Sequence, residues 1–88
     1  MVKVQGAVIS ERGITFAIVI VKPHILEFTK DREEAAQSFS RLFSKMPVIL
    51  MAQDARGEPK YWGRKDIVDF LLKTGIDRIQ WKEYTFQD

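Results

Sequence analysis

The sequence predicts an α/β fold of the α+β type, in which one mixed sheet of four to five strands is covered by two helices. Three observations lead to this prediction. Residues 14–22 and 48–52 are almost continuously apolar, which is typical of buried strands. Apolar side chains recur at helical spacing in residues 35–46, and Gly or Pro separates successive patterns. Because 88 residues supply material for a single core, we expect one domain over residues 1–88, in the order β-β-α-β-β-α-β.

The first two strands are expected to form an antiparallel hairpin. Residues 2–9 are rich in β-branched side chains, and residues 10–13, Ser-Glu-Arg-Gly, have the composition of a tight turn. Residues 14–22 form the second strand, and their apolar character predicts burial on both faces. Pro23 should end this strand, because proline has no N–H to donate to a sheet.

A long helix follows and is expected to begin near Asp31. Asp31 with Glu34 three residues later resembles a capping box, and the basic side chains of Arg41 and Lys45 suit the negative end of the helix dipole. The apolar stripe of this helix consists of Ala35, Phe39, Leu42, Phe43 and Met46.

The second half repeats the alternation of strands and a helix. Pro47 should close the long helix and open a strand at residues 48–52, which a turn at 56–59 joins to a short returning strand at 60–62. Gly63 or a neighbour should cap a second helix that runs to about Thr74, with Gly75 as its left-handed stop. Residues 76–86 should form a last strand with one wet face, at an edge of the sheet.

Composition excludes several classes of function. The chain has no cysteine, which removes disulfides, thiol nucleophiles and thiolate metal sites and favours a cytoplasmic setting. Neither a signal peptide nor a membrane span is expected, because the longest apolar segment is far shorter than the roughly 20 residues that a spanning helix needs. The net charge of +2 gives no strong field toward nucleic acid or lipid. Phosphate-binding glycine motifs and the serine nucleophile elbow are also missing.

Topology, rather than a motif, predicts a candidate site at one end of the sheet. If the second and third strands are parallel neighbours, their carboxyl ends lie together, and we expect both helix N-termini at the same rim. The candidate residues are Lys22, His24, Gln53, Asp54, Arg56 and Arg64. Two of them also have a structural interpretation: His24 can bond to backbone at a strand end, and Asp54 can form an Asx turn.

The segment 60–65, Lys-Tyr-Trp-Gly-Arg-Lys, combines aromatic rings with positive charge. Such residues can stack on bases while cations meet phosphates, and Tyr, Trp and Arg also dominate protein interfaces. Tyr61 and Trp62 are equally suited to filling a small core.

Several features of the second half occur together: Pro47, residues 48–51, a hairpin turning at Gly57, Gly63, and a helix containing Phe70 and Leu71. Over about a third of the chain they resemble the C-terminal half of thioredoxin-like proteins. The resemblance implies a related sheet topology and a candidate cis peptide at Met46-Pro47. The family's Cys-x-x-Cys is missing, so redox activity is excluded, and one helix stands where the family has two.

These observations favour a non-catalytic domain that binds another protein or a second copy of itself, with no cofactor, no metal and no membrane. One alternative is a small-molecule-binding protein or small enzyme that uses the rim around His24 and Asp54. Another is a single-stranded nucleic-acid binder that uses residues 61–65.

Overall fold

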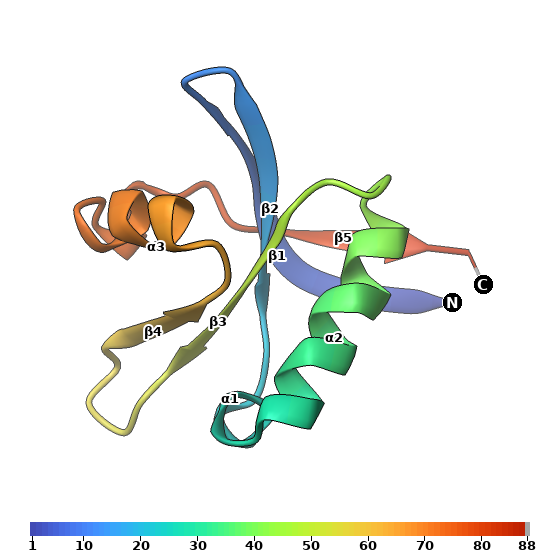
Figure 1. Ribbon diagram of the computed structural model, residues 1–88, viewed down its shortest axis with the longest axis horizontal. Coiled ribbons are helices and arrows are strands. Elements are labelled where there is room, and N and C mark those ends of the chain that lie inside the picture. Colours follow the sequence, from blue (N-terminus) through green and yellow to red (C-terminus); the bar gives the residue numbers. More distant parts are fainter. Residues whose placement is uncertain (88) are drawn as a thin grey trace.

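Five strands form one mixed sheet in the spatial order β4-β3-β2-β1-β5 (Figure 1). The computed structural model describes residues 1–87. The strands are β1 (Val2–Glu11), β2 (Ile14–Ile20), β3 (Val48–Gln53), β4 (Pro59–Trp62) and β5 (Lys82–Phe86). Only the β2–β3 pair is parallel, and the other three pairs are antiparallel. The predicted fold class, the element order and the edge position of the last strand are therefore confirmed.

Helices lie on both faces of this sheet (Figure 1). The helices α1 (Pro23–Glu27) and α2 (Thr29–Leu42) lie on one face, and α3 (Lys65–Leu72) lies on the other, followed by the short 3-10 helix η1 (Ile76–Arg78). Two apolar cores result, because successive residues of a strand point to opposite faces. In β2, Phe16 and Ile18 face α3, whereas Ala17 and Val19 face α2, so both faces of this central strand are buried, as the sequence predicts.

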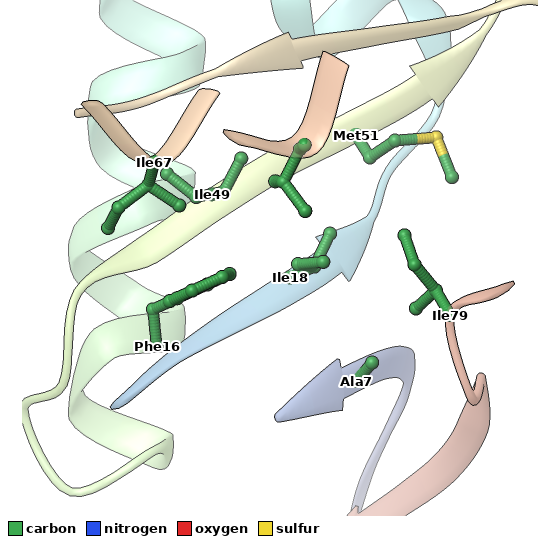
Figure 2. Packing of buried hydrophobic residues seen from close by; sticks show 8 residues of the cluster. Ala7, Phe16, Ile18, Ile49, Met51, Ile67 and Ile79 are labelled. Atoms are coloured by element: carbon green, nitrogen blue, oxygen red, sulfur yellow. The ribbon is translucent and has the colours of Figure 1, made fainter. Parts of the chain in front are cut away.

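The core on the α3 side is closed by two residues of that helix. Figure 2 shows Ile67 close to Ile49 and facing Phe16 of the sheet, and Ile79 approaching the same cluster from the chain that follows η1. Leu71, one helical turn beyond Ile67, is completely buried in this cluster. These contacts fix α3 on the sheet and so determine where the chain before and after it can lie.

A two-residue loop joins β1 to β2. Arg12 and Gly13 both have positive φ, 52° and 79°, as a type I′ hairpin turn requires. The pairing continues along both strands to Gly6 opposite Val19. At Gly6 a Cβ atom would collide with the carbonyl oxygen of Ile18, so glycine allows the close approach of the two backbones.

The structure corrects the predicted start of the long helix. It begins at Thr29, its N-cap is Phe28 without a side-chain cap, and Asp31 lies inside the first turn. The preceding residues form α1 instead of an extended lead, because Pro23 suits the first helical position, where no N–H is needed.

The C-terminal quarter also differs from the prediction. Gly75 has φ of −64° and precedes η1, so it is not a left-handed stop for α3. The last strand starts at Lys82 rather than at residue 76, because residues 76–78 turn as η1 and the Trp81 indole N–H donates to the Ile76 carbonyl oxygen at 3.0 Å. The alternation of apolar residues here reflects packing of Ile79 and Trp81 against the α3-side core and not a continuous strand.

Within residues 1–87, none of the helices has the length and apolar character needed to span a membrane.

Candidate functional site

The carboxyl ends of β2 and β3 meet, as the predicted rim requires. Ile20 pairs with Met51 in parallel register, and a hollow of about 390 Å³ lies between α1 and the β3–β4 connection. Its lining includes Gln53 and Asp54 but neither Lys22 nor His24, both of which are exposed. The rim therefore exists as a hollow, with four of the six expected polar side chains outside its lining.

The polar groups of Gln53 and Asp54 are engaged in the β3–β4 turn. Asp54 Oδ1 accepts the backbone N–H groups of Arg56 at 2.8 Å and Glu58 at 3.0 Å. The Gln53 side-chain amide donates to the Gly57 carbonyl oxygen at 2.9 Å. This is the Asx-turn arrangement, so these two side chains hold a loop together, and the Arg56 side chain is exposed beside it.

Arg64 lies at the opposite end of the sheet from the rim. β4 is antiparallel to β3, and Trp62 pairs with Leu50, so the chain has returned toward the start of β3 before α3 begins. The expectation that both helix N-termini share one rim is thus wrong. Arg64 instead binds Asp66 through two hydrogen bonds of 3.1 and 2.7 Å, and this guanidinium lowers the pKa of the Asp66 carboxyl.

Tyr61 and Trp62 point to opposite faces of β4 and do not form one stacking platform. Tyr61 packs against the α3-side core, where burial raises the pKa of its phenol. Trp62 packs on the α2 side, and the Arg32 guanidinium lies over its ring at 5.4 Å from the centroid. The partnership of Arg32 with Trp62 carries no sequence signal, because thirty residues separate them.

A second hollow of about 300 Å³ lies between the β1–β2 turn and α3. Its floor is apolar and includes Phe16 and Phe70, whose rings pack edge to face with centroids 6.5 Å apart. Three carboxylates and two basic groups surround it: Glu11, Asp66, Asp69, Arg12 and Lys73. Mixed charge around an apolar floor selects no particular ligand chemistry. Among the described residues, these carboxylates included, no three His, Cys, Asp or Glu side chains are placed so that they could hold one metal ion.

β5 has a free edge. The alternation of hydrogen-bonded and non-hydrogen-bonded pairs along the neighbouring strands determines which backbone N–H and C=O groups of β5 point outward from this edge. In a hairpin with a two-residue loop, the flanking residues Glu11 and Ile14 exchange N–H and C=O bonds. Odd-numbered residues of β1 therefore bond to β2, and even-numbered residues face β5. The bond from Ala17 N–H to the Pro47 carbonyl oxygen, 2.9 Å, agrees with this alternation across β2.

The same alternation of hydrogen-bonded residues applies to β5. Val4 opposite Tyr84 is a hydrogen-bonded pair, so the N–H and C=O groups of Tyr84 point into the sheet. Those of Glu83 and Thr85 point away from it, and no strand lies beyond β5 in the described part of the chain. Two donors and two acceptors are thus presented at this edge.

Aromatic side chains border the free edge on the α2 face. Phe43 follows the end of α2, and its ring packs edge to face against two rings of β5. The distances between ring centroids are 5.2 Å to Tyr84 and 5.1 Å to Phe86. The Lys82 ammonium lies 5.0 Å from the Tyr84 ring centroid. Tyr84 and Phe86 remain partly exposed, so an aromatic strip continues up to the unpaired backbone.

The opposite edge of the sheet is blunted. Asp54 N–H donates to the Glu58 carbonyl oxygen at 2.9 Å, which makes Lys60 an inward-facing residue and places Pro59 and Tyr61 outward. Because Pro59 has no N–H, the edge of β4 offers a single outward donor over its four residues. The two edges are therefore not equivalent, and β5 is the more open one.

Comparison of the chain with protein-family models, curated proteins and solved structures finds no match. The thioredoxin-like resemblance has no support from these comparisons, and the Met46-Pro47 peptide bond that it makes a cis candidate is trans.

Proposed function

We propose that this protein is a non-catalytic binding domain that takes up an extended segment of a partner protein as an additional strand beside β5. The observation that carries the proposal is the pair of outward backbone units at Glu83 and Thr85, next to a partly exposed aromatic strip. Main-chain hydrogen bonds supply affinity in strand addition, and alternate side chains supply selectivity. We include the cytoplasmic setting in the proposal because the chain has no cysteine.

The segment that such an edge accepts has a definite chemistry. It should be extended and free of proline where it bonds to Glu83 and Thr85, with apolar or aromatic side chains on the side of Tyr84 and Phe86. Lys82 at the start of the strand favours an acidic or aromatic side chain opposite it.

The two other functions have less support from the geometry. A rim-based ligand site would need Asp54, whose carboxylate already accepts two backbone N–H groups, and His24, which lies outside the hollow. A nucleic-acid platform would need Tyr61 and Trp62 on one surface, whereas they lie on opposite faces of β4.

The test is a selection of displayed random linear peptides against the wild-type protein, followed by binding of the recovered peptides to Thr85→Pro. Proline at residue 85 removes an N–H that faces away from the sheet, so the variant should fold while losing strand addition. We expect peptides with alternating apolar residues that bind the variant at least tenfold more weakly. Peptides that bind both proteins equally, or a selection that yields no binder, would overturn the proposal.

Two matched variants control for folding. Thr85→Val keeps the outward N–H and the β-branched side chain, so it should bind like the wild type. Tyr84→Pro removes an N–H that bonds to β1 and should lower the free energy of unfolding more than Thr85→Pro does. Urea unfolding of all three variants separates a lost edge from a lost fold.

A further inference from the structure

We infer that the strand added at this edge is β5 of a second copy of the chain, so that two sheets join across a two-fold axis into one sheet of ten strands. This inference rests on the proposed function, because it names the partner of the same edge. Three properties of the sheet support a second copy over a foreign segment. Two belong to β5: the arrangement of its backbone groups and the order of its side chains. The third is the edge at β4, where Pro59 removes an outward donor.

The free backbone groups of β5 are complementary to themselves. In antiparallel pairing centred on Tyr84, Glu83 lies opposite Thr85 of the second copy, and Thr85 lies opposite Glu83 of the second copy. Both are outward-facing residues, so each pair exchanges two hydrogen bonds. Every outward donor and acceptor from Lys82 to Phe86 is then satisfied without any residue outside the strand.

The side chains on the α2 face fit the same register. Tyr84 meets Tyr84 of the second copy in a non-hydrogen-bonded pair, where Cα atoms approach to about 4.5 Å and side chains contact most closely. Lys82 lies opposite Phe86 of the second copy. Its ammonium already lies over one aromatic ring, at 5.0 Å from Tyr84, so the second ring extends an existing contact.

Charge is also compatible on the α3 face. Glu83 lies opposite the uncharged Thr85 of the second copy, so no like charges oppose each other directly. Lys3 pairs with Thr85 within each chain, which places its positive charge two strands from Glu83 of the second copy, with the uncharged Thr85 between them. Glu83 is thus the only charged side chain that each copy places in the seam on this face.

Association through β5 stops at two copies. An isologous contact uses the same edge on both subunits, and the edges that remain are the two β4 strands, which Pro59 blunts. One five-residue strand forms less contact area than a standard interface, so we expect a weak dimer.

Sedimentation equilibrium over roughly 10 μM to 1 mM, a range suited to a small interface, tests the inference. The wild type should pass from 10.2 kDa toward twice this mass as concentration rises. Thr85→Pro removes two of the four seam hydrogen bonds and should raise the dimer Kd roughly 30-fold or more, while Thr85→Val should retain the wild-type Kd. A wild type that remains a monomer throughout, or a dimer that Thr85→Pro leaves unchanged, overturns the inference.

Amide hydrogen exchange of the wild type supplies a second measurement that needs no variant. The N–H groups of Glu83 and Thr85 should become protected as concentration rises, whereas that of Tyr84 should be protected at every concentration. Fast exchange at residues 83 and 85 in the most concentrated sample overturns the inference. The peptide selection still decides the proposed function separately, because a monomer whose peptides discriminate against Thr85→Pro binds a foreign segment at this edge.

Discussion

Replacement of Asp54 by alanine tests whether this carboxylate is a structural element of the β3–β4 turn. Its Oδ1 atom accepts the N–H groups of Arg56 and Glu58 at 2.8 and 3.0 Å. The turn is largely exposed, so water rehydrates both donors once the carboxylate is gone, and each bond contributes about 0.5–1 kcal/mol. We therefore expect Asp54→Ala to lower the free energy of unfolding by about 1–2 kcal/mol, the range found for similar side-chain caps.

Urea unfolding followed by far-UV circular dichroism measures this loss of stability. In a thermal scan, Tm should fall by roughly 4–16 °C for a domain of this size. Asp54→Asn is the matched control, because its side-chain oxygen can accept the same two bonds. It should cost less than about 0.5 kcal/mol, half of one such bond. An alanine variant as stable as the wild type would refute the structural role. An asparagine variant as unstable as the alanine variant would show that the negative charge matters and not the acceptor.

Three further changes probe the hairpin and the start of α3. Gly6→Ala should destabilise the protein by about 1–3 kcal/mol in urea unfolding, because its methyl group would collide with the Ile18 carbonyl and separate β1 from β2; a neutral effect would contradict that close approach. Arg12→Asn should raise the free energy of unfolding by about 0.5–1 kcal/mol, seen as a higher urea midpoint, because asparagine tolerates the left-handed φ of 52° better than arginine. An unchanged midpoint would argue against strain at this turn. Arg64→Ala should raise the pKa of Asp66, measured by NMR titration of its carboxyl. Since the folded-state pKa of Asp66 is lowered, its contribution to stability is present above the unfolded pKa and is lost as pH falls through the folded pKa, so the variant should show a weaker dependence of stability on pH in that acidic window.

The sequence predicts most of the fold because local signals agree with tertiary packing. The apolar run in β2 implies burial on both faces, and this strand lies at the centre of the sheet. Where prediction is wrong, a tertiary contact overrides a local pattern. Asp31 has the sequence of an N-cap, but α2 starts two residues earlier, where Arg32 in its first turn donates to the Leu26 carbonyl oxygen of α1 at 3.2 Å.

The candidate site divides in the same way. The meeting of β2 and β3 at one rim follows from the long connection between them, and the structure has that pair in parallel. The displacement of Arg64 to the other end could have been foreseen, because the predicted hairpin before it already reverses the chain. The adjacent positions of Tyr61 and Trp62 in a strand likewise imply opposite faces. The free edge of β5 is different: which backbone groups are outward depends on the loop length and register of a hairpin at the other end of the chain.

The pairing of the first strand with the last has a consequence for biosynthesis. Val2 lies opposite Phe86, so the first residues of β1 lie beside the last residues of β5 (Figure 1). Translation at roughly 5–20 residues per second delivers β5 about 4–16 s after β1, so β1 is the outer strand of any sheet that forms with β2 before β5 is made. A strand made later therefore shields one made earlier, and a chain truncated before residue 82 would leave the bonding groups of Val2, Val4 and Gly6 open to pairing with neighbouring chains.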